Sequence, residues 1–527
     1  MASEKPNVEV VENVDFAEPV ANEKTIIGLE QARLTDPPKP WSPTMLKLYM
    51  FCTVGFLCSS MNGFDGSLMS SLLILTPFQK HFGAEVDGTE AGIITAMYQI
   101  GSASSLPFIA QSMDWKGRRF GMFIGCLIIC IGTLIQGLSV LDFSNPKGMF
   151  YGGRFLLGFG VSLAASSAPT YIIEIAHPAY RGTLTGLYNI QYTIGSILAT
   201  GACRGSLVFT DNRAWLIPTW CQMIFPGFVV IFALFLPETP RWLYTHEKRD
   251  EALDFITKYH GLGDGQNAYV TLQVTEFEEY LDFKASDKKW WDYSCLFTPR
   301  SNRYRVACNI VMAIIPQFAS GGIGYYSGAF MKTCGITDPT TILNINLGLA
   351  FVSPFSGYFG ASFCDKIGRR KQFLGGLLFV TACWVALTPC TALVAEKNIK
   401  GAGIAAIFFS NLSGVGYCFG FTPLQALYPV EVLSYEMRAK GMAFNSFVLS
   451  AVLLINQFAA PIALATIGWK YYLVITAWDV FQFICAYFFL VETLGYTLEE
   501  LDDIFKQPNP KKASLERNPL ILQHDRN

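Results

Sequence analysis

Apolar runs of about twenty residues recur along most of the chain, and short polar segments separate them. Since an α-helix of about 20 apolar residues can cross a lipid bilayer, each run predicts a membrane-spanning helix. We place the spans at residues 45–73, 90–112, 120–140, 149–172, 184–203, 215–236, 306–331, 341–363, 373–394, 402–428, 443–465 and 471–491. The pattern predicts an all-α integral membrane protein with twelve transmembrane helices.

The spans form two groups of six, in residues 45–240 and 306–505, and a polar linker joins them at 241–305. Residues 1–44 and 506–527 are polar and lack an apolar run, so we expect disordered cytosolic tails. No cleavable signal peptide is recognisable, and we expect the first span to act as the targeting signal.

Short cytosolic helices, rather than a second domain, are expected in the linker. From Arg249 to His260 the apolar residues recur at helical spacing. This spacing predicts an amphipathic helix whose buried face contains Ala252, Leu253, Ile256 and Tyr259.

Composition supports a membrane protein and excludes other classes. Hydrophobic residues make up 51% of the chain and charged residues only 15%, below the roughly 25% of soluble domains. The net charge of −2 argues against a nucleic-acid partner, which needs a basic face. The cysteines lack metal-ligand spacing, so we expect no metal or other cofactor. A disulfide between Cys203 and Cys334 is a less favoured alternative to free thiols.

Lysine and arginine are unevenly divided between the two sides of the predicted membrane. Of the 39 in the chain, only eight fall in loops on the side away from the linker: Lys80, Lys147, Arg204, Arg213, Lys332, Lys397, Lys400 and Lys470. Because basic residues favour the cytosolic side of a membrane, we expect the linker and both termini to be cytosolic.

Charged motifs recur between the two groups of spans. The sequence DWKGRR at 114–119 returns as DKIGRR at 365–370, a shift of 251 positions. Glu174 followed by Arg181 returns as Glu431 followed by Arg438, shifted by 257 positions. PETPR at 237–241 returns in part as VETLG at 491–495, with 254 positions between the glutamates. The chain is therefore predicted to be two six-helix repeats, which is typical of transporters that bind solute between the repeats.

These ordered motifs, together with ETLGYTLE at 492–499, resemble the sugar porter family of the major facilitator superfamily over residues 45–505. GFDGS at 63–67 and TPLQALYPVE at 422–431 resemble the fungal lactose- and cellobiose-permease-like subgroup. The resemblance implies the major facilitator fold, transport of a sugar or a sugar-like solute, and a plasma-membrane location.

In the resembled family, the charged motifs form cytosolic networks that close the outward-facing state and break as the halves rock. Carried over, this gating role falls to Asp114, Arg118, Arg119, Glu174, Arg181, Glu238, Arg241, Asp365, Arg369, Arg370, Glu431, Arg438 and Glu492. An arginine fork can meet a carboxylate through two hydrogen bonds. The alternative is that these charges are solvated and only determine topology; their recurrence in both halves favours gating.

One acid and one base lie inside the apolar runs of the first half. An ionised Asp65 at membrane depth costs several kcal/mol unless it is paired or hydrated, and Arg154 is the basic residue well inside a run. We expect the two to pair, and Asp65 to take up a proton when they separate. Proton symporters of the resembled family carry an acid at this first-helix position. A static buried ion pair is the alternative.

Sugar sites combine amides, which bond to hydroxyls, with aromatic faces. Family positions give Asn189, Gln317, Ser320, Tyr325, Tyr326 and Gln425 as solute-binding candidates, and Asn456 adds an amide at membrane depth. The chain departs from the family, because Asn189 stands where Gln is usual and Ala426 where Trp is usual. Each amide can instead form an interhelical hydrogen bond worth about 0.6–2 kcal/mol, and both interpretations stay open.

Asp479 is a second acid inside the membrane, in the last span. The resemblance assigns it no role. A polar contact to a neighbouring helix is the favoured interpretation, and a role in proton coupling is the alternative.

The leading hypothesis is a secondary active transporter that takes up a sugar or sugar-like solute together with protons, acting as a monomer in the bilayer. A transporter of a secondary metabolite or a quinate-like organic acid on the same scaffold is the alternative. A non-transporting sugar sensor is more remote, because only a short segment follows Phe505. No nucleophile with a base and no phosphate loop is recognisable, so we do not expect an enzyme.

Overall fold

The computed structural model describes residues 32–83, 89–141, 145–286, 293–319, 324, 326–434, 437–494, 496 and 498–515. Within these residues the chain is helical and forms no β-strand. The first half contains α2 (Pro43–Leu72), α4 (Thr89–Lys116), α5 (Arg118–Leu138), α6 (Pro146–Ile175), α7 (Arg181–Ser206), and α8 (Arg213–Cys221) with α9 (Ile224–Ala233). The second half contains α13 (Arg300–Ala319) with α14 (Ser327–Thr333), α15 (Pro339–Ile367), α16 (Arg369–Lys397), α17 (Lys400–Gly420) with α18 (Thr422–Val432), α19 (Arg438–Ile467) and α20 (Lys470–Phe489).

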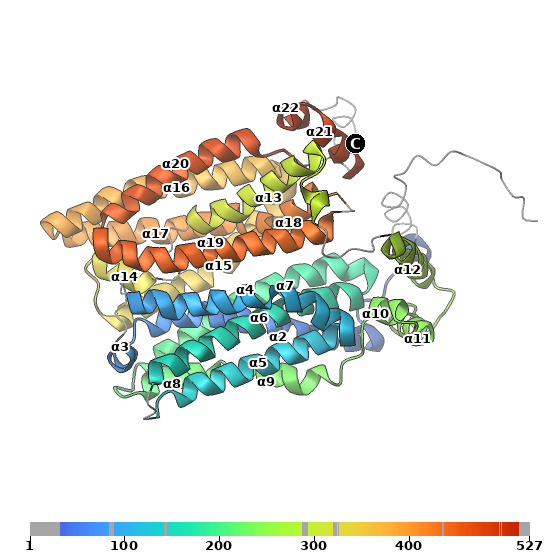
Figure 1. Cartoon of the computed structure of the whole chain (residues 1–527), viewed down its shortest axis with the longest axis horizontal. Helices are drawn as coiled ribbons and strands as arrows, with labels where there is room; N and C mark the ends of the chain where they lie inside the picture. The colour runs from blue at the N-terminus through green and yellow to red at the C-terminus, as the bar shows by residue number, and fades with distance from the viewer. Residues whose placement is uncertain are drawn as a thin grey trace, which may run out of the picture.

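Short helices lie outside these spans. They are α3 (Thr76–Phe82), η1 (Pro178–Tyr180), α10 (Pro240–Thr245), α11 (Arg249–Tyr259), α12 (Ala268–Ser286), η2 (Ser294–Leu296), α21 (Leu498–Lys506) and α22 (Pro510–Leu515). The long helices lie side by side in an elongated bundle (Figure 1). The helices α3, α8 and α14 lie toward one end, and α10, α11, α12, α21 and α22 lie at the other, which we call the linker end (Figure 1).

The all-α architecture with twelve spans is confirmed, but the expectation of unbroken helices at 215–236, 306–331 and 402–428 is wrong. Each of these spans consists of two consecutive helices. Proline explains two of the interruptions, because it has no backbone N–H and clashes with the preceding turn. Pro226 follows the break between α8 and α9, and Pro423 follows the break between α17 and α18.

The spans differ in polarity. Among the described residues, nine helical segments are long and apolar enough to cross a membrane; α4, α7 and α13 are not among them. Those three helices carry polar side chains such as Gln99, Gln191 and Gln317. Polar side chains inside a membrane protein usually face other helices or a water-filled cavity, so α4, α7 and α13 are the helices expected to line a polar path.

Several long helices begin with the same local signal, a polar cap followed by proline. Ser42 Oγ accepts a hydrogen bond from Met45 N (3.2 Å), and Asp338 Oδ2 accepts one from Thr341 N (2.9 Å). Asn145 caps α6 in the same way. The caps satisfy backbone N–H groups that have no partner within the helix, and proline has the φ angle of the first helical position.

The two halves touch through α4 with α19 and through α7 with α15. At the end of α7, Arg204 Nε donates to Asn344 Oδ1 on α15 (2.8 Å). Gly92, in the first turn of α4, packs beside Pro461 and Phe458 near the end of α19. These contacts lie at the end of the bundle opposite the linker, so the halves meet there.

In the linker, α11 forms as predicted, but one member of its predicted buried face is wrong. Ala252, Phe255 and Ile256 are buried, whereas Leu253 is 36% exposed. Phe255 takes the place of Leu253 because its ring packs against the Tyr259 ring at 4.7 Å between centroids. The face that docks on the bundle was therefore rotated in the prediction by part of a turn.

Parts of both tails are ordered, in contrast to the expected disorder. Asp36 Oδ2 accepts a hydrogen bond from Ala268 N at the start of α12 (2.9 Å). In the C-terminal tail α22 forms, and Ser514 Oγ accepts from Glu492 N (3.2 Å). Residues 1–31 and 516–527 lie outside the described part.

Cysteine supplies no cross-link. Cys203 and Cys334 are buried free thiols, so the alternative of a disulfide between them is not realised.

Candidate functional site

Asp65 lies in α2 and is completely buried. Gln222 donates its side-chain N–H to Asp65 Oδ1 (2.5 Å), while Asp65 Oδ2 has no hydrogen-bond partner. Gln222 follows α8 directly, at the interruption of the sixth span. The acid of the first span is thus held by an amide from the sixth.

Arg154 lies on α6 with 3% of its surface exposed. Its guanidinium carbon lies 5.0 Å from the centre of the Tyr98 ring on α4. Asp65 and Arg154 are near enough to interact electrostatically, but no ion pair within 4.0 Å joins these two described side chains. The expected direct pair is therefore not formed in this conformation, because Gln222 takes one carboxylate oxygen and Tyr98 faces the guanidinium.

Gln222 was not among the residues predicted from the sequence, although its amide inside an apolar run is a recognisable signal. An amide within the apolar run 215–236 needs a polar partner, as a buried amide without one costs free energy. The run lies far from Asp65 in the sequence, so only the fold could identify that partner.

Glycines let the helices around Asp65 approach closely. A methyl group on Gly63 would lie 1.8 Å from the Tyr192 carbonyl oxygen on α7, and one on Gly195 would lie 1.8 Å from the Ser60 carbonyl oxygen on α2. Real carbon–oxygen contacts are far longer, so only glycine fits at this crossing. The glycines of the GFDGS motif therefore position the carboxyl-bearing helix against α7.

The solute candidates fall into two groups. Tyr326 and Asn456 are buried, and their polar atoms hold helices together: the Tyr326 hydroxyl donates to Gln457 O (2.6 Å), and Asn456 Nδ2 donates to Gln317 O (2.7 Å). Gln425 is half-buried and donates to the Tyr417 hydroxyl (3.0 Å). In this conformation Asn456 and Tyr326 act as interhelical contacts, whereas the partly exposed side chains of Gln317 and Gln425 can still face a solute.

The remaining solute candidates cannot be placed. The side chains of Asn189, Ser320 and Tyr325 lie outside the described part of the structure. Their role as solute ligands stays a prediction.

At the linker end, the structure brings the charged residues of the first half together. Arg118 Nη2 donates to Glu174 Oε1 (3.0 Å), and Arg118 Nε lies 3.0 Å from Glu174 Oε2 as an ion pair. Arg119 Nε lies 3.4 Å from Glu238 Oε2, and Glu238 Oε1 accepts from the backbone N–H of Arg118 (3.0 Å). Burial raises the pKa of Glu238, while the N–H donors and Arg119 oppose that rise. The Thr239 hydroxyl donates to Glu174 Oε2 (2.6 Å).

The second half repeats this arrangement. Arg369 donates to Glu431 through Nη2 (2.9 Å) and Nε (3.2 Å), and its backbone N–H donates to Glu492 Oε1 (2.9 Å). The Thr493 hydroxyl donates to Glu431 Oε2 (2.6 Å). Arg370 Nε donates to Leu490 O (3.0 Å). The predicted carboxylate partners are thus in contact in each half, and their gating role stays a prediction.

The backbone conformation explains why each half has a glycine in its charged motif. Gly117 and Gly368 both have a φ angle near +95°, at 94° and 96°, which side chains other than glycine rarely adopt. A methyl group on Gly117 would also lie 2.1 Å from Glu238 Oε2. The turn aims the first N–H groups of α5 and α16 at the buried glutamates, where the helix N-terminus favours negative charge.

Five further gating candidates are placed only in part. Two of them, Arg181 and Arg241, lie close enough to act on each other electrostatically, and Glu174 and Glu276 also act on Arg181. The side chains of Asp114, Asp365 and Arg438 lie outside the described part. Their predicted contacts remain untested.

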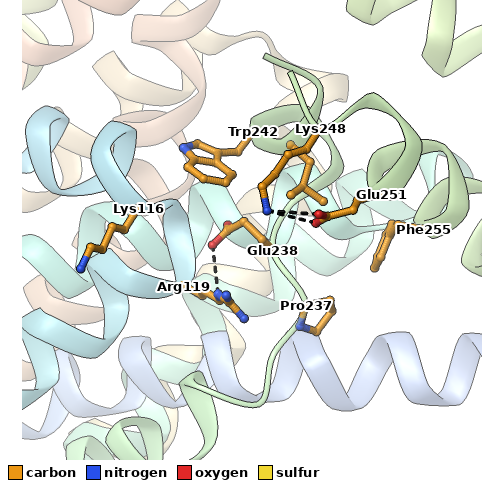
Figure 2. Close-up of a pocket in the computed structure, with 9 residues that line it drawn as sticks. Lys116, Arg119, Pro237, Glu238, Trp242, Lys248, Glu251 and Phe255 are labelled. Carbon is orange, nitrogen blue, oxygen red and sulfur yellow. Dashed lines mark hydrogen bonds and ion pairs between the residues drawn. The ribbon is translucent and has the colours of Figure 1, made fainter. Parts of the chain in front are cut away.

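A cavity of about 390 Å³ opens beside the first-half network. Figure 2 shows Arg119 pointing toward Glu238, with Lys248 and Glu251 joined on the neighbouring α11 segment. Lys248 Nζ lies 3.1 Å from Glu251 Oε1. Charges of both signs line the cavity, namely Lys116, Arg119 and Lys248 with Glu238 and Glu251.

The Arg369 fork predicts a stability difference. Lysine keeps the positive charge but cannot form two parallel hydrogen bonds. Hydrogen bonds to charged groups contribute about 1.5–3 kcal/mol each, so we expect Arg369→Lys to lower the free energy of unfolding by about that amount. Thermal unfolding of the purified protein would measure it, with exposed Arg303→Lys as the control. Equal unfolding temperatures of the two variants would contradict the prediction.

Two histidines dock the linker on the bundle. His260 contacts Ile175 O through Nε2 (3.0 Å) at the end of α6, and Gln273 Oε1 through Nδ1 (2.9 Å). The His177 ring lies 5.5 Å from the His260 ring and 4.6 Å from the Tyr269 ring. Burial lowers the pKa of His177 to about 3 and of His260 to about 4. Both side chains are therefore neutral at neutral pH.

Acid should loosen this docking. The histidines have lower pKa values in the folded state than the ordinary 6.5, so the opened state binds protons first as the pH falls. Their stabilisation is complete above about pH 6.5 and declines toward pH 4, by about 1.4 kcal/mol per pH unit and histidine. We expect hydrogen exchange in α11 and α12, corrected for its intrinsic rate, to accelerate between about pH 6.5 and pH 5. His260→Gln should weaken this pH dependence, and an unchanged profile would contradict the assignment.

Known proteins are similar to most of this chain. It is 26% identical over 498 residues to the quinate permease of Emericella nidulans, covering 90% of this chain and 92% of the relative. It is 28% identical over 486 residues to hexose transporter 2 of Kluyveromyces lactis, covering 87% and 83%. The inward open structure of the E. coli xylose transporter XylE matches with a TM-score of 0.70 at 18% identity, covering 87% of this chain and 99% of XylE. At that identity the likeness shows the shared fold.

The family model described as "Sugar (and other) transporter" matches residues 51–505, which include both six-helix halves and the linker. This match confirms the resemblance drawn from the charged motifs. The chain therefore belongs to the sugar porter family of the major facilitator superfamily and is a transporter rather than an enzyme.

Proposed function

We propose that this transporter takes up a sugar or sugar-like solute together with protons by alternating access. We further propose that it acts as a monomer in the plasma membrane, with the linker end and both termini in the cytosol. The excess of basic residues on the linker side supports this orientation.

The observation that carries the coupling proposal is the environment of Asp65. Its carboxyl group is completely buried, one oxygen has no partner, and Arg154 is near but not in contact. Direct contact with an arginine stabilises an ionised carboxylate, whereas separation in a dry interior favours the neutral acid. A rearrangement that moves Arg154 toward or away from Asp65 would therefore release or bind a proton.

The two charged networks provide the conformational element. Each described network lies within one half at the linker end, whereas the contacts between halves described above lie at the opposite end. In the proposed orientation this conformation faces inward. Rocking to the outward-facing state would bring the two networks together on the cytosolic side. The networks would then be separated in one state and in contact in the other.

The polar helices support a solute site between the halves. Gln317 and Gln425 remain partly exposed and can match the donors and acceptors of hydroxyl groups. The tenth span is interrupted between α17 and α18, a few residues before Gln425, and such breaks commonly line binding cavities in transporters.

A quinate-like organic acid is the second candidate solute. Named relatives include the quinate permease of Emericella nidulans. The buried guanidinium of Arg154, whose Nε has no hydrogen-bond partner, could bind the carboxylate of an anionic solute. A carboxylate bound there would compete with Asp65 for the same cation.

Uptake by the full-length protein in proteoliposomes would test the proposal. A panel of monosaccharides, disaccharides, polyols and quinate-like acids is added while the external pH is recorded. Alkalinisation with one neutral solute supports sugar–proton symport, and alkalinisation with an acid supports the second candidate. Solute accumulation without any proton movement would overturn the coupling proposal.

A further inference from the structure

The last span contains a buried carboxyl group, Asp479, that takes no part in the proposed proton coupling at Asp65. Asp479 lies nine residues after Lys470 and ten before Phe489, the ends of α20. At 1.5 Å per residue, this is about 14 Å from either end. The side chain is 0% exposed, so Asp479 lies near the middle of the span and inside the protein.

The polar partners of Asp479 are on its own helix. With the Gln482 amide oriented to satisfy both of its atoms, its nitrogen donates to Asp479 Oδ1 (3.2 Å) and its oxygen accepts from Trp478 Nε1 (2.8 Å). Asp479 Oδ2 has no hydrogen-bond partner. The amide thus supports one oxygen only and brings no positive charge.

The helices packed against α20 bring no counter-charge to this depth. They are α16, α13 and α19. Among the titratable side chains described on these helices are Arg370, Cys383 and Cys390 on α16, Tyr304, Arg305 and Cys308 on α13, and Lys440 on α19, and α20 itself carries Lys470, Tyr471, Tyr472, Cys485 and Tyr487. The Tyr304 hydroxyl donates to Phe489 O at the linker end of α20 (3.0 Å). The Arg305 side chain is bound to Asp502 and to Val432 O at the linker end.

The helix register shows how far those basic groups lie from Asp479. Cys308 Sγ lies 3.5 Å from Phe489 O, so Arg305 and Cys308 face the linker end of α20, about 15 Å from Asp479. Arg370, at the start of α16, donates to Leu490 O (3.0 Å), beyond the same end. An ionised carboxylate without a counter-charge inside a membrane protein costs several kcal/mol, so the neutral acid is the form that fits this environment.

The internal repeat relates the contact that contains Asp479, between α13 and α20, to the contact that contains Asp65, between α2 and α8. We call each of these contacts a seam. The starts of α2 and α13, at Pro43 and Arg300, are 257 positions apart, as are the starts of α8 and α20. At this offset Asp479 corresponds to Gln222, the residue that holds Asp65. One seam thus carries its acid on the first span, and the equivalent seam carries its acid on the last.

The seventh span is interrupted at the same depth. Phe318 lies next to the end of α13, and its ring lies 6.0 Å from the Trp478 ring. The following helix, α14, begins only at Ser327. Separation of α13 from α20 at these two rings would bring water to Asp479.

We propose that Asp479 is a second proton-binding group, protonated in this conformation, which releases its proton when the seam between α13 and α20 is hydrated. In that step the O–H bond of the carboxyl group breaks, its electron pair stays on the oxygen, and water accepts the proton. The reverse step restores the neutral acid. This inference does not depend on proton coupling at Asp65.

Infrared spectroscopy of the full-length protein in lipid tests proton binding directly, because a neutral carboxyl group has a carbonyl band distinct from the carboxylate bands. We expect a band at neutral pH that is absent from Asp479→Asn, shifted in Asp479→Glu and retained in Asp65→Asn. We also expect it to decrease as the pH is raised. Identical spectra for the wild type and Asp479→Asn, or a band that no pH changes, would overturn the proposal.

The number of protons moved per solute molecule is a second measurement that tests the proposal. In Asp479→Asn we expect the ratio to fall by one proton while uphill uptake through Asp65 continues. If the wild type moves no protons with any solute, the coupling proposal fails, whereas the infrared titration still decides whether Asp479 binds and releases a proton. A normal ratio in Asp479→Asn would show that its proton is not exchanged during transport and would overturn the release step.

Discussion

Asp65→Asn is expected to abolish uphill solute uptake while leaving exchange of solute across the membrane largely intact. Asparagine keeps the shape of the side chain and can still meet Gln222, which bonds to Asp65 in the native protein. It cannot exchange a proton, however, and it permanently resembles the neutral acid, so the step in which Asp65 releases its proton is blocked whatever the state of Asp479. Exchange of solute does not need that step, whereas net uphill uptake does, so accumulation above the external concentration should be lost.

Counterflow and uphill uptake in the same proteoliposomes would separate these two effects. Asp211→Asn is the matched control, because Asp211 is an exposed aspartate at the end of the bundle opposite the linker, with 59% of its side chain accessible. It should behave as the wild type in both assays. Unchanged concentrative uptake by Asp65→Asn, with the wild-type pH dependence, would rule out Asp65 as the coupling group.

Gly63→Ala is expected to prevent stable folding. The added methyl group would lie 1.8 Å from the Tyr192 carbonyl oxygen, and 2.7 Å from its carbonyl carbon. Both are backbone atoms of α7, so no side chain can rotate away, and the two helices would have to separate. Overpacking in a core typically costs about 1–3 kcal/mol, and a contact between helix backbones belongs at the upper end of that range or above it.

Expression level, monodispersity in detergent and the thermal unfolding temperature would measure the loss. Gly195→Ala should have a similar effect, since its methyl group would lie 1.8 Å from Ser60 O. Gly201→Ala is the control, because it lies on the same α7 with no neighbouring atom within 4 Å of the added methyl group. If Gly63→Ala and Gly201→Ala were equally stable, the close helix crossing at Asp65 would be wrong.

Most of the architecture could be predicted because its signals are local or repeated. Long apolar runs are needed wherever a helix crosses lipid, and polar caps followed by proline mark where α2, α6 and α15 begin. The interruptions of the sixth, seventh and tenth spans were not predicted, since each apolar run continues through its break. Pro226 and Pro423 are local signals for two of the breaks, but a proline inside an apolar run can kink a helix or end it, and packing against neighbouring helices decides which.

The charged networks could be predicted in outline, since the same motifs occur in both halves. Sequence order suggested that Arg118 and Arg369 meet Glu174 and Glu431, and the structure brings these groups together. It did not suggest the threonines, which bind the second oxygen of each glutamate. A hydroxyl group is too common along a chain to be a signal by itself.

The sequence by itself determined that Asp65 and Arg154 would both be buried, because an apolar run gives a charged residue no other place to be. Only the tertiary structure decided which groups face them: Gln222 holds Asp65, Tyr98 faces Arg154, and the two charges do not touch. The reason is physical. Burial follows from the composition of one helix, whereas a partner depends on the rotation and depth of several helices packed together, and close glycine contacts between α2 and α7 set that geometry.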